Sequence, residues 1–353
     1  MGASDHNDRS QDAPQLLGAT AFKPPERHGL DIVKYLIYDK EKGEFFTRTP
    51  KSWALITIFY LIYYTCLAAF WYGMLQLFFM TVTLDQPKYL LEENIIGNNP
   101  GVGMRPRQAD ANIDSSMLFL NAREFKGSAR AQPDFEGTTN ADWEGRYAAY
   151  IKSYENTTGI QDCTADTELK KGDKACKFDT ATLGECGVAP FGYFAEKGDK
   201  NSQASPCILL KVNRIFGWQP QPYDLQYIDA DQEEDDPIPG DVRKLIEQDP
   251  NQIYVDCFGE NPADVEALDG NIKYFPENRG IPFYYFPYTQ AHNNYHNPLV
   301  AVKFNNLNPG QLIHVECKLW AKGIKHDRKD KLGGIRFEIL LEESADRRDK
   351  REL

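Results

Sequence analysis

The sequence predicts a single membrane-spanning helix followed by a mainly β domain with one helix, arranged as a sandwich and held together by disulfides. Three observations carry this prediction. Residues 52–84 contain no Asp, Glu, Lys or Arg. Downstream of them, short apolar runs are separated by Gly, Pro and Asn, the pattern of strands and turns. Six of the seven cysteines lie in this downstream part, and none precedes residue 52.

The chain of 353 residues is long enough for one span and one or two domains. We expect a tail of residues 1–51, a transmembrane signal anchor of residues 52–84 and a β-rich domain of residues 85–353. The balance of 40 Lys and Arg against 52 Asp and Glu argues against a nucleic-acid partner, because nucleic-acid-binding domains are usually basic. The tail carries eight basic and eight acidic residues, so the net charge of −12 belongs to the C-terminal side.

The uncharged segment exceeds the roughly 20 apolar residues with which a helix crosses a bilayer. It is also too long, and begins too late in the chain, for a cleaved signal peptide. Only Lys88 lies within roughly 20 residues on its C-terminal side, and basic residues mark the cytoplasmic flank. The sequence therefore predicts a single-pass type II protein with its N terminus in the cytoplasm. The basic residues of the N-terminal flank are Lys34, Lys40, Lys42, Arg48 and Lys51.

Two tyrosines inside the predicted span suggest a contact within the membrane. At about 100° per residue, Tyr60 and Tyr64 share one helix face. A buried phenol hydroxyl favours a hydrogen-bonding partner, so the face could pack on another membrane helix. The alternative is that both rings simply occupy lipid volume, and the sequence leaves the two interpretations open.

The cysteines downstream of the span predict disulfides. An even set confined to one side of a membrane is typical of an oxidising compartment. Zinc is the alternative, but the chain has no C-x₂-C pair. Fifteen pairings are possible, and spacing alone does not choose among them. The cysteines are Cys163, Cys176, Cys186, Cys207, Cys257 and Cys317. The one N-x-[ST] sequon, at Asn156, also lies downstream and predicts glycosylation.

The β-rich part has several predicted elements. Aromatic and apolar residues at helical spacing from Trp143 to Tyr154 predict one amphipathic helix. Residues 97–106 are expected to form a Gly/Pro/Asn linker. The predicted strands are Met117–Phe125, Pro206–Ile215, Ile253–Phe258, Leu299–Phe304, Leu312–Leu319 and Ile335–Leu341.

No catalytic, cofactor or metal site is expected. The chain has no phosphate-binding loop, no dinucleotide fingerprint, no H-E-x-x-H and no nucleophile elbow. His292 and His296 have the i, i+4 spacing of helical metal ligands, but Pro298 and the Asn-rich surroundings favour a loop. The acidic run Asp229–Asp236 lacks the calcium-binding spacing, and a solvated loop is expected there.

Residues 281–288 form an aromatic run that contains two prolines. Tyrosine is favoured in interface cores, so the run predicts a contact with a partner. A small hydrophobic core beneath a loop is the alternative. The geometry of the prolines leads us to expect at least one ring available to a partner.

Several segments together form a specific pattern: Phe45–Thr49 with Ser52-Trp53, Phe59–Ala68, Leu183–Cys186, Pro206–Trp218, Tyr285–Tyr288, Pro298–Phe304 and Val315–Cys317. This pattern resembles the β subunit of the sodium/potassium-transporting ATPase. The resemblance covers almost everything after about Tyr35. Phe286 departs from the pattern, because the family usually has a tyrosine there.

The resemblance implies an immunoglobulin-like sandwich with an interrupting helix, and disulfides Cys163–Cys176, Cys186–Cys207 and Cys257–Cys317. It implies a plasma-membrane, non-catalytic subunit that supports folding, delivery and potassium affinity of a catalytic α subunit. Tyr60 and Tyr64 would contact that subunit in the membrane. Tyr285, Phe286, Pro287 and Tyr288 would contact it outside. A small single-span regulatory subunit is a further expected partner.

Two alternatives remain at this point. A proton/potassium pump β subunit is less expected, because such chains typically carry several sequons. A cell-adhesion or junction glycoprotein would act through its outer domain alone, and would have no use for specific tyrosines in the span.

Overall fold

A computed structural model describes residues 37–39, 43–46, 48–83, 87–95, 97–107, 116–127, 139–170, 173–199, 201–226, 228, 236–289 and 294–342. Lys34, Lys40, Lys42, His292 and residues 229–235 of the acidic run lie outside these ranges. The chain divides into two compact units, Met1–Thr81 and Val82–Leu353.

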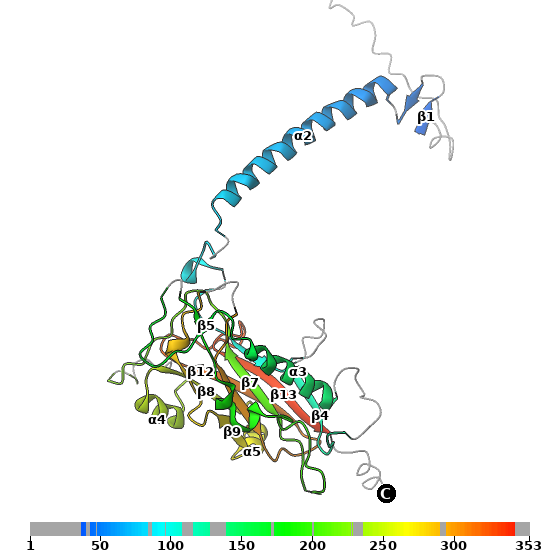
Figure 1. The fold of residues 1–353 in the computed structure, drawn as a ribbon. Coiled ribbons are helices and arrows are strands. Elements are labelled where there is room, and N and C mark those ends of the chain that lie inside the picture. The colour runs from blue at the N-terminus through cyan, green and yellow to red at the C-terminus, as the bar shows by residue number, and fades with distance from the viewer. Residues whose placement is uncertain are drawn as a thin grey trace, which may run out of the picture. The chain divides into compact units, whose positions relative to one another are not determined.

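Among its described residues, the first unit contains a short hairpin and one long helix (Figure 1). Strands β1 (Tyr38–Asp39) and β2 (Glu44–Phe45) pair antiparallel, and helix α2 spans Pro50–Met80. The helix begins two residues earlier than predicted, because the Thr49 hydroxyl caps it and Pro50 needs no hydrogen-bond acceptor at the first position. It ends four residues earlier than predicted, at Met80.

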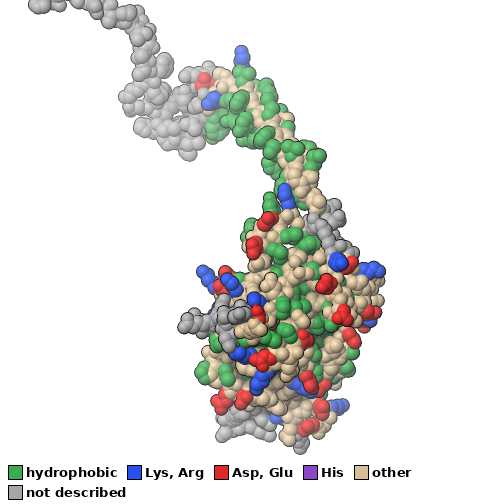
Figure 2. Space-filling view, turned by 90° about the vertical axis from the view of Figure 1, so that its left-hand side faces the viewer, with side chains coloured by type: hydrophobic (Ala, Val, Ile, Leu, Met, Phe, Trp, Pro, Cys, Tyr) green, Lys and Arg blue, Asp and Glu red, His purple; other side chains and the backbone are tan. Residues whose placement is uncertain are grey.

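Helix α2 has the properties of a membrane anchor. Among the described residues it is the one helix long and apolar enough to cross a membrane. None of its side chains is buried, and hydrophobic side chains cover the face seen in Figure 2. An apolar helix surface of this length is stable in hydrocarbon, because all its interior backbone groups are paired within the helix.

The second unit is built on two sheets. One has the strand order β10-β8-β12-β13-β4 and the other β3-β7-β11-β9, and every pair is antiparallel except β13 with β4. The first sheet contains β4 (Met117–Asn121), β8 (Gln252–Gly259), β10 (Gly280–Pro282), β12 (Leu312–Trp320) and β13 (Gly334–Glu342). The second contains β3 (Val102–Arg105), β7 (Cys207–Val212), β9 (Ile272–Phe275) and β11 (Leu299–Phe304). Strands β5 (Ile160–Gln161) and β6 (Ala175–Cys176) form a separate parallel pair.

All six predicted strands are confirmed, within a few residues at their ends. Their alternating pattern places one face of each sheet in a shared core: β13 buries Phe337, Ile339 and Leu341. The ring of Phe337 meets Phe304 of β11, in the other sheet, at 6.0 Å between centroids. The predicted linker 97–106 is wrong in part, because Val102 and Met104 are buried in strand β3.

The predicted amphipathic helix is confirmed as α3 (Asn140–Lys152). A capping box begins it: the Thr139 hydroxyl accepts from the Asp142 backbone, and the Asp142 carboxylate accepts from the Thr139 backbone. The expectation of one helix in this domain is wrong. Helices α4 (Gly240–Gln248) and α5 (Pro262–Leu268) also form, and both pack on β8. Both are too short to be stable without this packing, so their periodicity is a weak signal in the sequence.

Three disulfides cross-link the second unit. They join Cys163 to Cys176, Cys186 to Cys207, and Cys257 to Cys317. These are the pairs that the family resemblance implies. The middle bridge ties the 3₁₀ segment Thr180–Gly187 to strand β7, and the last joins two neighbouring strands. Cys66, in helix α2, is free and exposed.

Candidate functional site

The aromatic run folds against the loop that follows strand β7. The backbone N–H of Gly217 donates to the Tyr288 carbonyl at 2.8 Å, and Phe216 and Tyr288 form a parallel bridge. Trp218 meets Phe286 edge-to-face at 5.4 Å. These contacts place the end of the aromatic run beside the end of β7, at one corner of the four-stranded sheet.

Tyr285 and Phe286 belong to the core of the domain. Their exposed fractions are 7% and 9%. Tyr285 packs on Phe178, and burial raises the pKa of its hydroxyl. In this structure both side chains fill space inside the domain, and the expected contact of these two residues with a partner stays a prediction. Pro287 and Tyr288 are half-buried and remain accessible in part.

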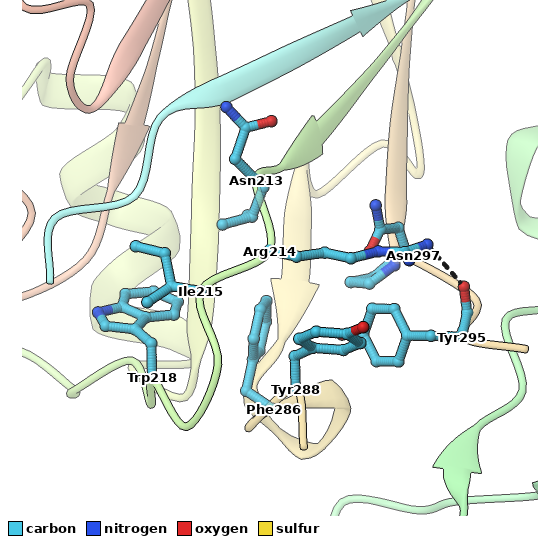
Figure 3. A pocket seen from close by; sticks show the side chains of 10 residues that line it. Asn213, Arg214, Ile215, Trp218, Phe286, Tyr288, Tyr295 and Asn297 are labelled. Atoms are coloured by element: carbon cyan, nitrogen blue, oxygen red, sulfur yellow. Dashed lines mark hydrogen bonds between the residues drawn. The ribbon is translucent and has the colours of Figure 1, made fainter. Parts of the chain in front are cut away.

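Arg214 organises the accessible part of this corner (Figure 3). Its guanidinium group donates from Nε to Oδ1 of Asn297 and from Nη2 to the Tyr295 carbonyl, each at 3.0 Å. It also lies 5.4 Å from the ring centroid of Tyr288 and 5.0 Å from that of Tyr295. A cation placed over two aromatic faces is attracted by both ring quadrupoles.

These side chains enclose a small pocket, which we call the Arg214 pocket (Figure 3). Its walls are aromatic and apolar, with a few polar groups. Asn297 is 2% exposed, and its Nδ2 has no hydrogen-bond acceptor among the described residues. The pocket is lined by Val212, Asn213, Arg214, Ile215, Trp218, Phe286, Tyr288, Tyr295, Asn297 and Pro298.

Sequence reasoning missed Arg214, Tyr295 and Asn297. The partners of Arg214 lie 81 and 83 positions further along the chain, a separation that no local pattern reports. The one signal in the sequence was the Asn-rich stretch that contains Tyr295 and Asn297, and we interpreted that stretch as a plain loop.

The two tyrosines of the predicted membrane contact lie on α2. The rings of Tyr60 and Tyr64 stack, with centroids 6.0 Å apart and planes 23° from parallel. Their exposed fractions are 50% and 60%, so the described residues leave at least half of each side chain open. The helix thus presents a pair of preformed, flat aromatic surfaces.

The sequon lies near the Arg214 pocket. Asn156 is exposed, and its side-chain oxygen accepts from the Thr158 backbone N–H at 3.1 Å. The Asn156 carbonyl lies 2.9 Å from Nε2 of His296, which is buried. Desolvation lowers the pKa of His296, which favours the neutral ring. His296 therefore has a structural contact, and His292, the other histidine of the i, i+4 pair, lies outside the described residues.

The described residues also correct one expectation for the acidic run. Asp236, the last residue of Asp229–Asp236, is not merely solvated. Its carboxylate pairs with Lys318 at 2.7 Å and with His326 at 2.6 Å. It is therefore anchored to β12 and the segment after it. Within the described ranges, no group of three or more His, Cys, Asp or Glu is arranged to hold a metal ion.

Comparison with known proteins gives a consistent result. A family model described as "Sodium / potassium ATPase beta chain" matches residues 23–337. The chain is 33% identical over 325 residues to "Sodium/potassium-transporting ATPase subunit beta-2" of Drosophila melanogaster, covering 91% of this chain and 95% of the relative. It is 34% identical over 330 residues to subunit beta-1 of the same organism, covering 91% and 96%. A probable beta-3 subunit of Caenorhabditis briggsae is 31% identical over 334 residues, covering 93% and 91%.

Proposed function

Because the chain belongs to the sodium/potassium ATPase β-chain family, we propose that it helps the catalytic α subunit of the pump to fold, to reach the plasma membrane and to bind potassium. As a member of that family it is a non-catalytic, membrane-anchored subunit that associates with the α subunit. ATP hydrolysis and ion coordination belong to the partner. The observation that carries the proposal is the match over residues 23–337, which includes helix α2 and every strand of both sheets except the last part of β13.

We infer a type II orientation, with residues 1–51 in the cytoplasm and the β-rich domain outside. Two independent features support it. Basic residues gather on the N-terminal flank of α2. The six bonded cysteines and the sequon at Asn156 are all on the C-terminal side, where an oxidising compartment would form disulfides and add a glycan.

The proposed architecture of the outer domain is an immunoglobulin-like sandwich. The facing sheets, with Phe304 of one against Phe337 of the other, support a sandwich. In this account α3 is the interrupting helix, since it stands between strands β4 and β7 along the chain. The rigid sandwich would hold the Arg214 pocket at a fixed place for the partner.

Two contacts with the α subunit are proposed. In the membrane, the exposed pair of Tyr60 and Tyr64 would pack on a helix of the α subunit. Outside, Pro287 and Tyr288 would meet an outward-facing loop, while Tyr285 and Phe286 support them from within the core. A small single-span regulatory subunit, as a further partner, rests on the family resemblance alone.

Surface delivery of the α subunit tests this function. Cells that express the α subunit with and without this chain should differ strongly in the amount of α subunit at the cell surface. A chain truncated after residue 49 serves as the matched control, since it lacks the helix and the domain. Equal surface amounts of the α subunit in all three cases would contradict the proposal. An adhesion role without the pump is the less favoured alternative, because the family match includes the membrane helix.

A further inference from the structure

Basic side chains lie along the antiparallel pair of strands β3 and β7, and just beyond the C-terminal end of each strand, without acidic partners. Arg105, Arg107, Lys211 and Arg214 form no ion pair with any described carboxylate. We call these four residues the basic corner. It adjoins the Arg214 pocket, because Arg214 belongs to both.

The sheet register explains why these cations are close together. Lys211 of β7 lies opposite Gly103 of β3. Arg105 is two residues from Gly103 and therefore on the same face. The stem of Lys211 crosses over Gly103, since a Cβ at that glycine would lie 3.0 Å from Lys211 Cε. The guanidinium group of Arg105 packs over the Tyr150 ring, 5.4 Å from its centroid.

This concentration of charge is costly for the isolated chain. The pKa of Lys211 is lowered to about 8. Burial is the largest cause, and the positive charges of Arg105, Arg214 and Arg107 contribute the rest. Elsewhere in the domain neighbouring cations share a carboxylate: Lys273 and Lys303 both pair with Glu185. A chain with net charge −12 has many carboxylates, yet no described one lies here. Retained unpaired charge of this kind points to a ligand that is supplied from outside.

The corner also offers unused hydrogen-bond donors. The hydrogen bonds of Arg214 go to an amide oxygen and a carbonyl, so its charge is not neutralised. Nδ2 of the buried Asn297 has no acceptor among the described residues. Positive charge together with free donors fits a carboxylate, which is an acceptor-only anion.

We propose that the basic corner receives an acidic loop of the catalytic subunit, exposed on the same side of the membrane as the β-rich domain. This inference rests on the proposed function and names the chemistry of that contact. A protein loop fits better than a lipid headgroup for one reason on the surface itself: Arg214 packs on Tyr288, so one partner segment can meet the proposed aromatic contact and the cations together. Carboxylates of the loop would offset the repulsion among Lys211, Arg105 and Arg214.

The test removes charge from the corner without touching Arg214, which also shapes the pocket. The double variant Arg105→Gln, Lys211→Gln is co-expressed with the catalytic subunit, beside the control Lys244→Gln on the exposed side of α4. The complex is purified in mild detergent at low and at high salt. We expect assembly of the double variant to fall at least about tenfold at low salt, as for the loss of a close charge pair. The control should assemble like the natural chain, and high salt should narrow the difference.

A thermal unfolding measurement on each full-length chain separates binding from folding. The double variant should melt at the same or a higher temperature, because like charges have been removed. The charge-preserving variant Arg105→Lys, Lys211→Arg should keep most of the assembly. Unchanged assembly of the double variant, or a loss that merely follows a lower melting temperature, would overturn the proposal.

Two further outcomes distinguish a failure of the proposed acidic-loop contact from a failure of the proposed function. Failure of the natural chain to assemble would overturn the proposed function itself. If the double variant assembles normally but no longer binds phosphatidylserine vesicles, the occupant of the basic corner is a lipid headgroup and the inference is wrong.

Discussion

Cys257 and Cys317 lie directly opposite each other on the neighbouring strands β8 and β12, with their Cα atoms 4.0 Å apart, and are joined by a disulfide. The bridge closes a loop with a sequence separation of 60. In the chain-entropy description, a loop of this length contributes about 4 kcal/mol to stability. The double variant Cys257→Ser, Cys317→Ser should lose stability on this scale and be retained in the endoplasmic reticulum.

Surface biotinylation and a melting curve check this prediction. Cys66→Ser is the control, because that thiol is free and exposed on α2; it should reach the surface normally. Normal delivery of the double variant would show that strand pairing alone holds this sheet.

Removing the hydroxyl of Tyr288 distinguishes a contact with the partner from a packing role of this side chain. Its ring packs on Tyr295 and Phe216, but its hydroxyl forms no hydrogen bond with the described residues. Tyr288→Phe should therefore leave the melting temperature unchanged. It should weaken assembly with the α subunit by about 1 kcal/mol if the hydroxyl bonds to the partner.

Tyr295→Phe is the matched control for that variant. The Tyr295 hydroxyl is buried and donates to the Tyr285 carbonyl at 3.2 Å. Its removal should lower the melting temperature with little effect on assembly of the folded chain. Co-precipitation of Tyr288→Phe at natural levels would rule out the hydroxyl contact.

The stacked rings of Tyr60 and Tyr64 on α2 should affect the potassium activation of the pump and not the membrane insertion of this chain. Tyr60→Leu, Tyr64→Leu keeps the helix hydrophobic but removes two rings and two hydroxyls. We expect normal insertion and a shifted potassium activation of ATP hydrolysis. Tyr72→Leu is a suitable control, since Tyr72 lies roughly a third of a turn away around the helix. Identical potassium activation in the double variant would mean that the tyrosines only occupy lipid volume.

Lys211 should give the domain a distinct pH dependence. Its folded-state pKa of about 8 lies below the value of 10.5 for a free lysine. Between these values the unfolded chain binds more protons, so this residue makes stability rise with pH. Lys211→Gln should therefore be more stable than the natural chain at pH 7, and the difference should shrink as the pH approaches 10.

Chemical unfolding of both chains at several pH values measures this difference. Comparing the two chains cancels the titration of the buried tyrosines. A difference in the free energy of unfolding between the two chains that stays constant from pH 7 to pH 10 would show that Lys211 titrates like an exposed lysine.

The sequence was sufficient for elements whose signal is local. The apolar segment predicted α2, and alternation predicted strands such as β12 and β13. Strand β3 was not predicted, because Gly103 interrupts its apolar pattern. The structure shows that this glycine leaves space for the side chain of Lys211. Helices α4 and α5 were not predicted either, because helices this short depend on tertiary packing, which strand β8 provides here.

The candidate site was predictable only in part. The aromatic composition drew attention to residues 281–288, but alternation and spacing could not tell that Tyr285 and Phe286 turn into the core. Arg214 depends on Tyr295 and Asn297, which lie beside it because β7 pairs with β11. Contacts between distant segments of this kind are decided by tertiary packing.

All of these proposals depend on the assembly of this chain with the catalytic subunit of a sodium/potassium pump. Affinity purification of the full-length chain from its native membranes in mild detergent, followed by peptide mass spectrometry, tests it most directly. We expect an ATPase α subunit in equimolar amount, with ATP hydrolysis that depends on sodium and potassium in the purified fraction. Recovery of the chain without any ATPase polypeptide, under conditions in which its three disulfides remain intact, would contradict it.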